Sequence, residues 1–249
     1  MNISFDNKVV LITGASKGIG AQLADDFGRL KAKMILTAAH REGFNRIKEF
    51  VHKKKYKADC YQLDFTDAAS IQEFLDCLQR YQQIDVCVNN AGINEVALIE
   101  QAREEAWDDI FDVNLKGPFL LMRALASKMK KRRYGRIINV SSIFGVVTRE
   151  KRSIYSASKS GLLGLTRTTA VELARYNVLV NAVSPGFVWT DLTRRILSKK
   201  EALSLTKQIP CGRMANPQDI SKVVLFLASE YNSYIVGQNI IVDGGYVSV

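Results

Sequence analysis

The stretch KVVLITGASKGIG, residues 8–20, places an apolar run directly before a turn that contains three glycines. The run at 8–13 predicts a buried strand, and helical periodicity follows near 19–30. Gly14, Gly18 and Gly20 remove side chains where backbone must approach a pyrophosphate, and the N-terminus of the next helix offers N–H groups to an anion. A strand, a glycine-rich turn and a helix in this order favour a nucleotide site, with a plain tight turn as the alternative.

Seven apolar, β-branched runs alternate with longer segments of helical periodicity along the chain. The runs lie at residues 8–13, 33–38, 58–63, 84–89, 135–141, 178–184 and 239–243, and the helical segments lie near 19–30, 43–55, 68–81, 103–131, 154–176 and 217–229. This alternation predicts a parallel sheet with helices on both faces. We therefore expect one doubly wound α/β domain over residues 1–249, a Rossmann fold of seven strands. Residues 186–210 contain no further strand, and we expect them to form a helical flap over the ligand.

Composition narrows the class of protein. With 249 residues, 47% of them hydrophobic, the chain is long enough for one large domain and contains no apolar run long enough to span a membrane. Four cysteines without CxxC spacing indicate reduced thiols, and two histidines far from any cysteine or carboxylate cluster make a metal site unexpected. We expect a cytoplasmic protein without a metal.

The 35 basic and 25 acidic residues give a net charge of +10, partly gathered in short basic clusters. Such an excess suits an anionic partner or a solvated surface, and both interpretations stay open. The sequence contains no paired Cys/His finger, no aromatic and glycine RNA signature and no heptads, so we expect neither nucleic acid nor a membrane as a partner.

Two further segments end strands at the same predicted edge of the sheet. NNAG, residues 89–92, follows the fourth run, and its small residues suit a flat ring that lies over backbone. Asp64 ends the third run, where its carboxylate can accept from an adenine amino group. A helix N-cap is the alternative for both Asp64 and Asp67.

IYSASKSG, residues 154–161, places Tyr155 and Lys159 one helical turn apart, so that both side chains emerge on one face. A general acid should titrate near the working pH, and an unperturbed tyrosine, with a pKa of ~10, donates a proton poorly near neutral pH. An ammonium ~4 to 5 Å away stabilises a phenolate by roughly 3 to 4 kcal/mol at an effective dielectric of ~20, which lowers the pKa of the phenol. The pair therefore predicts a proton donor, with a solvated helix surface as the alternative.

TGASKGIG, NNAG, Asn114 in DVNLKG, Ser142 in NVSS, YSASK and SPG occur in this order in the chain. Together they resemble the short-chain dehydrogenase/reductase family over essentially the whole chain, and most closely its branch of 3-oxoacyl-(acyl-carrier-protein) reductases and related carbonyl reductases. The resemblance implies an enzyme that interconverts a ketone and a secondary alcohol by hydride transfer with a nicotinamide dinucleotide. A non-catalytic relative that only binds the dinucleotide is the competing class.

The resemblance implies four catalytic residues. Tyr155 is the acid/base, and Lys159 lowers its pKa and holds the ribose hydroxyls of the cofactor. Ser142 holds the substrate carbonyl, with Ser141 as the alternative, and Asn114 kinks its helix and anchors a water that relays protons to Lys159. The implied cofactor-binding residues are Gly14, Ser16, Lys17, Gly18, Ile19, Gly20, Ala38, His40, Arg41, Asp64, Phe65, Asn90, Ala91, Gly92, Tyr155, Lys159, Pro185, Gly186, Val188 and Thr190.

The end of the second run discriminates between the two nicotinamide dinucleotides. A carboxylate there would accept from the ribose 2′-OH and repel a 2′-phosphate. The chain reads LTAAHREG, without an acid before Glu42, while Lys17, His40 and Arg41 can face a phosphate. We expect NADP(H) rather than NAD(H), with simple solvent exposure as the alternative for Lys17 and Arg41.

The loop before Tyr155 reads GVVTREKRSIY and carries four charged residues at 149–152, where the carrier-protein reductases are neutral. A solvated or subunit-facing loop and a clamp for an anionic substrate both account for these charges. Arg132, Arg133 and Arg175 stand near the positions where those reductases receive the acidic carrier protein, so acyl-carrier protein is a candidate partner. A sugar, sugar acid or nucleotide sugar is the alternative substrate. The family also implies a homotetramer built from the two long helical segments.

Overall fold

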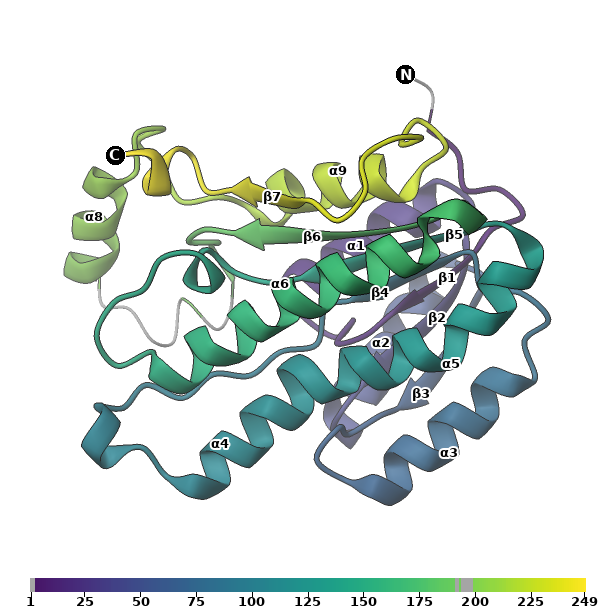
Figure 1. Ribbon diagram of the computed structural model, residues 1–249, viewed down its shortest axis with the longest axis horizontal. Coiled ribbons are helices and arrows are strands. Elements are labelled where there is room, and N and C mark those ends of the chain that lie inside the picture. The colour runs from purple at the N-terminus through teal and green to yellow at the C-terminus, as the bar shows by residue number, and fades with distance from the viewer. Residues whose placement is uncertain (1–2, 191–192, 194–198) are drawn as a thin grey trace.

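The computed structural model describes residues 3–190, 193 and 199–249. Within these residues, seven parallel strands form one sheet in the order β3-β2-β1-β4-β5-β6-β7 (Figure 1). The strands are β1 (Val9–Ile12), β2 (Lys33–Ala38), β3 (Ala58–Gln62), β4 (Val86–Asn89), β5 (Gly135–Val140), β6 (Val178–Pro185) and β7 (Asn239–Val242). Each predicted strand is present, and the predicted doubly wound fold is confirmed.

Helices cover both faces of the sheet (Figure 1). One face carries α1 (Gly18–Arg29), α2 (Arg41–Lys54) and α9 (Pro217–Ala228), and the other carries α3 (Ala68–Gln79), α5 (Gly117–Arg132) and α6 (Ser153–Leu173). α4 (Glu104–Phe111) precedes α5, and α8 (Lys199–Gln208) lies beyond the carboxyl ends of β6 and β7. The short turns are η1 (Ile99–Gln101), η3 (Ile143–Gly145), η4 (Ala174–Tyr176) and η5 (Tyr246–Ser248), and η2 (Asp112–Lys116) is a π turn. In the described part of the chain, no helix has the length and apolar character needed to cross a membrane.

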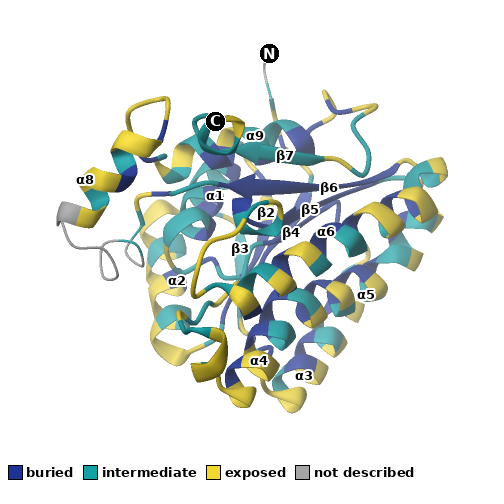
Figure 2. Ribbon diagram, turned by 60° about the vertical axis from the view of Figure 1, so that its left-hand side comes forward, coloured by how far each residue is buried: buried dark blue, intermediate teal, exposed yellow. Residues whose placement is uncertain are grey.

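Each face of the sheet packs its own apolar layer. Val10 and Ile12 belong to the layer under α1, α2 and α9, whereas Leu11 and Cys87 belong to the layer under α3, α5 and α6. Successive residues of a strand point to opposite faces, so a strand covered on both sides is apolar throughout. β1 and β4 are buried at every position, and Figure 2 shows these strands enclosed while the outer faces of the helices are exposed. The continuous apolar runs of the sequence follow from this double burial.

The strand order reverses between β1 and β4. From β1 the sheet extends through β2 and β3 to one edge, and from β4 it extends through β5 and β6 to the other. Chain connections leave the carboxyl ends of β1 and β4 in opposite directions, which opens a crevice there in doubly wound folds. The loops after these two strands are therefore placed to form the functional site.

The long helix predicted near 103–131 is interrupted. α4 ends at Phe111, the π turn spans Asp112–Lys116, and α5 begins at Gly117. A π turn holds an extra residue, which rotates the side chains that follow and frequently marks a functional site. Asn114 lies in the middle of this turn, so the helix is irregular at the residue where the resemblance implied a kink.

The predicted flap at 186–210 is described in part. α8 supplies its helix, while residues 191–192 and 194–198 lie outside the described residues. Closure of this flap over a ligand stays a prediction. That residues 1–249 form a single domain is also still a prediction.

Candidate active site

The glycine-rich turn between β1 and α1 forms a cradle of backbone. Gly14 has φ +65°, a conformation that residues with a side chain rarely adopt. A Cβ on Gly20 would lie 2.2 Å from the Gly14 carbonyl oxygen, so a side chain does not fit here and the two segments pack backbone against backbone. Ser16, Gly18 and Ile19 are half-buried on the same turn, which leads into the N-terminus of α1. This arrangement fits the pyrophosphate of a dinucleotide.

The end of β4 holds this turn in place. The Asn90 Nδ2 group donates to the carbonyl oxygens of Thr13, at 2.9 Å, and Gly14, at 3.2 Å. The Thr13 hydroxyl accepts from the backbone N–H groups of Asn90 and Ala91, each at 3.0 Å. Thr13 was not among the predicted site residues, although its place directly before Gly14 was an available signal. The side chain of Asn90 thus shapes the cradle.

The loop after β6 lies against the other side of the turn. A Cβ on Gly18 would be 3.3 Å from Cγ2 of Thr190. Pro185 ends β6, and Gly186 and Val188 lead from it to this contact. The fold therefore gathers three predicted segments, far apart in the sequence, at one edge of the sheet.

The end of β2 forms the corner of the site next to the glycine turn. A Cβ on Gly43 would lie 3.1 Å from both the Ala38 Cβ and the Ser16 Oγ, so these residues adjoin. Three basic residues are exposed at the starts of α1 and α2 around this corner: Lys17, His40 and Arg41. The corner holds no carboxylate at position 38 and is bordered by positive charge.

The residues after β3 have separate roles. The Asp64 carboxylate accepts from the backbone N–H of Thr66, at 3.0 Å, and from its hydroxyl, at 2.8 Å. Asp67 is the N-cap of α3 and accepts from the Ala69 N–H at 2.9 Å. The N-cap interpretation is therefore right for Asp67 and wrong for Asp64. Phe65 is buried, so its backbone alone is free to face the crevice.

Tyr155, Lys159 and Ser142 meet at this edge of the sheet. Tyr155 is half-buried near the start of α6, and its hydroxyl hydrogen bonds with the Ser142 side chain. The Lys159 ammonium lies 5.7 Å from the centroid of the Tyr155 ring and donates to the Val140 carbonyl at 2.9 Å. Ser141, the alternative to Ser142, instead donates to the backbone carbonyl of Lys159 at 3.2 Å. The two serines are thus distinguished by their partners.

The pKa of Tyr155 lies above its usual value, contrary to the prediction. Burial disfavours the phenolate and outweighs the hydrogen bond with Ser142 and the positive charge of Arg152, which both act to lower the pKa. Burial also lowers the pKa of Lys159 to about 8. The predicted lowering by Lys159 is wrong for this structure, because desolvation dominates the surroundings of the phenol. Tyr155 is held in its protonated form, the form that donates a proton.

Asn114, in the π turn, forms hydrogen bonds with the loop after β4 and with α6. Its Oδ1 accepts from the Ile93 N–H at 2.9 Å, and its Nδ2 donates to the Ile93 carbonyl at 2.9 Å and to the Ser158 hydroxyl at 3.1 Å. A Cβ on Gly92 would lie 3.3 Å from the Asn114 Oδ1 and 3.4 Å from the Lys159 Nζ. Asn114 and Lys159 therefore border the same exposed glycine.

A chain of buried amides beneath the crevice was not predicted. Asn89 donates to Asn139 at 2.7 Å, and Asn139 donates to Thr166 at 2.8 Å, which links β4, β5 and α6. A polar residue inside a strand buried on both faces must find a partner within the protein. The asparagines within the apolar runs VCVN and RIINV were the signal for such a network.

Aromatic rings line the site on the side of Tyr155. The Phe144 ring packs edge-on against Tyr155, with ring centroids 6.4 Å apart, and against Phe187, at 6.1 Å. Phe187 in turn packs against Tyr246 at 5.1 Å. The Arg152 guanidinium lies over the Phe144 ring, 5.8 Å from its centroid. A planar or apolar substrate would meet these rings on its way to Tyr155.

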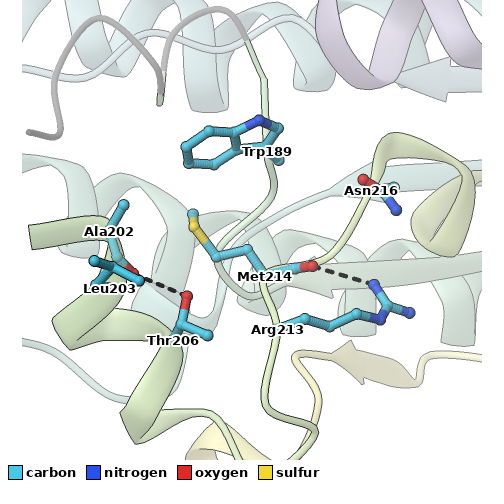
Figure 3. A pocket seen from close by; sticks show the side chains of 7 residues that line it. All are labelled: Trp189, Ala202, Leu203, Thr206, Arg213, Met214 and Asn216. Carbon is cyan, nitrogen blue, oxygen red and sulfur yellow. Dashed lines mark hydrogen bonds between the residues drawn. The ribbon is translucent and has the colours of Figure 1, made fainter. Parts of the chain in front are cut away.

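A cavity of about 550 Å³ opens beside the loop after β6 (Figure 3). Figure 3 shows Trp189 on one side of it and Leu203, from α8, on another, with Met214 between them. The remaining lining residues are Ala202, Thr206, Arg213 and Asn216. Its size and mostly apolar lining suit a small molecule or a short acyl chain.

The chain matches the family model described as enoyl-(acyl-carrier-protein) reductase over residues 14–247. It is 41% identical over 243 residues to a 3-oxoacyl-(acyl-carrier-protein) reductase from Thermotoga maritima, covering 97% of this chain and 98% of the relative. The protein of the same name from Escherichia coli K12 is 36% identical over 248 residues, which are 99% of this chain and 100% of the relative. Among solved structures, a gluconate 5-dehydrogenase from Burkholderia cenocepacia in complex with NADP and tartrate superposes with a TM-score of 0.91 at 29% identity, covering 99% of this chain and 97% of the other.

Fold, site and relatives together define an oxidoreductase that acts on the CH–OH/C=O couple of a small molecule with a nicotinamide dinucleotide. The chain belongs to the short-chain dehydrogenase/reductase family. The family and the class of enzyme predicted from the sequence are thereby confirmed, against the competing class of non-catalytic relatives.

Proposed function

We propose that this protein reduces a ketone to a secondary alcohol with NADPH, and that Tyr155 is the proton donor. The observation that carries the proposal is the meeting of Tyr155, Ser142 and Lys159 beside a glycine cradle that fits a dinucleotide. The bound dinucleotide would supply the hydride for the carbonyl carbon.

Each side chain would have a separate task at the carbonyl. The Ser142 hydroxyl would hold the carbonyl oxygen next to the phenol, and Tyr155 would give this oxygen a proton as negative charge develops. Lys159, with a pKa of about 8, is mostly protonated at neutral pH and would hold the ribose hydroxyls. Asn114 borders the same glycine as Lys159 and would anchor the water that returns a proton to the site.

A panel of carbonyl compounds tests this function directly. Oxidation of NADPH, followed by its absorbance, is expected with at least one 3-oxoacyl thioester. Tight binding of NADPH without turnover of any ketone, sugar or thioester in the panel would contradict the proposal.

NADP(H) is the proposed cofactor because of the corner around Ala38. This corner lacks a carboxylate and is bordered by Lys17, His40 and Arg41, which can contact a 2′-phosphate. The solved gluconate 5-dehydrogenase binds NADP, in line with this proposal.

Ala38→Asp is expected to reverse the cofactor preference. The new carboxylate would accept from the 2′-OH of NADH and repel the 2′-phosphate of NADPH, so the ratio of kcat/KM for NADPH over NADH should fall by about 100-fold. Ala38→Asn is the matched control, because it adds the same volume without the charge. Equal kcat/KM for the two cofactors in the parent protein would rule the preference out.

We propose 3-oxoacyl thioesters as the first substrate class. The relatives from Thermotoga maritima and Escherichia coli are reductases of 3-oxoacyl groups on acyl-carrier protein. The apolar cavity lined by Trp189, Leu203 and Met214 has room for an acyl chain next to the loop after β6. Reduction of short and long 3-oxoacyl thioesters at different rates would support this use of the cavity.

Acyl-carrier protein is the proposed macromolecular partner, and Arg133 is the proposed contact. Arg133 and Arg175 adjoin at the end of α5, where Arg133 donates to the Arg175 carbonyl at 3.3 Å. Arg132 is unsuited to this role, because it pairs with the buried Asp85 at 2.9 Å. α5 has 16 residues, so this cluster lies about 24 Å from the edge that carries Tyr155. An oligomer that places Arg133 and Arg175 of one copy near the active site of another copy would shorten the distance between the docked carrier protein and a Tyr155.

Arg133→Glu is expected to lower kcat/KM on a 3-oxoacyl-carrier protein by about tenfold, because it reverses a charge that steers the acidic partner. Activity on a short thioester that lacks the carrier protein should not change. Lys53→Glu on α2 is the matched control for the change in net charge. Equal losses on both substrates would contradict a docking role.

We also propose a homotetramer, in which α5 and α6 form the contacts between copies. Phe119 on α5 and Val171 on α6 are 42% and 80% exposed, so both apolar side chains are available for contacts between copies. Sedimentation analysis distinguishes a tetramer from a monomer.

The cytoplasm is the proposed compartment. The four cysteines are free thiols, as expected in a reducing environment. Fractionation of cells that express the protein tests this placement.

Sugar acids are the second candidate substrate class. The solved gluconate 5-dehydrogenase, which is named for a sugar acid, superposes on 99% of this chain. The charged loop at 149–152 gives this candidate its support within the present chain. Turnover of gluconate-type acids that depends on this loop would favour it over thioesters.

A further inference from the structure

Arg152 stands beside the proposed proton donor without a partner of opposite charge. It directly precedes α6, is half-buried, and lies over the Phe144 ring that also contacts Tyr155. Its Nε is buried and has no hydrogen-bond partner, and among the described residues it takes part in no ion pair. A buried cationic donor without an acceptor is costly, so this position beside Tyr155 has room for an acceptor that the chain itself does not supply, such as an anion.

A second arginine adds to the positive charge at this place. Burial lowers the pKa of Arg152, and the charge of Arg149 acts in the same direction, while the groups that affect it include no carboxylate. Glu150 lies in the same loop but is exposed and forms no ion pair with a described residue. An anion bound at Arg152 would relieve the repulsion between the two arginines.

We propose that Arg152 forms a carboxylate site beside Tyr155, and that the protein therefore reduces small free oxo acids in addition to 3-oxoacyl thioesters. This inference rests on the proposed function, because it uses the same proton donor. With Phe144 against one face of the guanidinium, the N–H edge is left for a planar acceptor, which a carboxylate matches with two parallel hydrogen bonds. Since Phe144 contacts both residues, one short molecule can place its carboxylate at Arg152 and its ketone at Tyr155.

The reaction balances with the components already proposed. The π bond of the ketone breaks, a C–H bond forms with the hydride of NADPH, and an O–H bond forms with the proton of Tyr155. An oxo acid and NADPH thus give a hydroxy acid and NADP⁺, and Tyr155 regains its proton from solvent. The carboxylate undergoes no change and serves to orient the ketone through Arg152.

The test compares acetoacetate with methyl acetoacetate, which share the reacting ketone and differ in the charge of the acid group. We expect Arg152→Gln to lower the acid-to-ester ratio of kcat/KM by about 10- to 100-fold, mainly through the KM of the acid. Any effect of the lost charge on Tyr155 acts on both compounds and cancels in the ratio. Arg152→Lys should lie in between, because it keeps the charge and loses the two-pronged geometry.

Lys53→Gln is the control, because it removes one exposed positive charge from α2, outside the loop at 149–152. Titration of acetoacetate into the NADP⁺ complex by calorimetry adds a readout that needs no turnover. We expect Arg152→Gln to weaken this binding by about tenfold or more and Lys53→Gln to leave it unchanged.

The outcomes separate this inference from the proposed function. An unchanged ratio and unchanged acetoacetate binding in Arg152→Gln, or equal losses in Lys53→Gln, would overturn the carboxylate site and leave ketone reduction intact. If the parent protein reduces neither compound, ketone reduction by Tyr155 fails for this pair. In that case, calorimetry still tests the role of Arg152. If acetoacetate does not bind to the parent protein, the carboxylate site is overturned too.

Discussion

Tyr155→Phe is expected to lower ketone turnover by about 100-fold or more, while affinity for NADPH stays close to that of the parent protein. The substitution removes only the hydroxyl, which hydrogen bonds with Ser142 and would deliver the proton. The ring that packs against Phe144 and lies near Lys159 stays in place. Steady-state kinetics measures the first effect, and titration of the protein with NADPH measures the second.

Tyr176→Phe is the control for loss of a tyrosine hydroxyl. Tyr176 lies in η4 at the other end of α6, where its ring contacts Lys130 and Arg175, so turnover of a small ketone should not change. If Tyr155→Phe kept most of the activity, another group would have to deliver the proton. A parallel loss of NADPH affinity in Tyr155→Phe would instead show that the hydroxyl serves cofactor binding.

Gly20→Ala is expected to weaken NADPH binding by about 100-fold or more and to lower the free energy of unfolding by about 1–3 kcal/mol. The added Cβ would lie 2.2 Å from the Gly14 carbonyl oxygen and 2.6 Å from the Asn90 Nδ2. Both groups belong to the network that shapes the cradle, so the turn has to move away from the position that fits a pyrophosphate. Fluorescence titration with NADPH and chemical denaturation measure the two effects.

Gly164→Ala provides the matched control for a helical glycine. The nearest atom to its added Cβ, Nη2 of Arg167, is 4.0 Å away, so the substitution should keep NADPH affinity. Replacement of glycine by alanine inside a helix stabilises it by about 0.5–1 kcal/mol, which gives the opposite sign in the denaturation experiment. Parent-like NADPH affinity in Gly20→Ala would show that the cradle is not the dinucleotide site.

The positions of the strands could be predicted because a strand that is buried on both faces forms a continuous apolar run in the sequence. A strand such as Val86–Asn89 is covered on both faces, so its residues are apolar regardless of which helices cover it. The sequence signal for the π turn was weaker. Asn114 marked an irregular place in the helix, but the extra residue of a π turn has no sequence period of its own.

The candidate site was predictable where a backbone shape or a helical spacing carries it. Gly14 and Gly20 are required by the turn itself, and Tyr155 and Lys159 share a face because they are four residues apart in α6. Thr13 directly precedes Gly14, but the partners of its hydroxyl were not predictable, because they belong to a loop that follows another strand. Such a partnership depends on which strands are neighbours in the sheet.

By itself, the sequence determined the alternation of strands and helices, the glycine turn and the pairing of Tyr155 with Lys159. Tertiary structure alone decided the direction of the Tyr155 pKa and the isolation of Arg152. The physical reason is range: backbone conformation and helical spacing depend on residues within a few positions of each other. Desolvation and the lack of an acceptor depend on every atom that packs around a group, and these atoms come from segments that only the fold brings together.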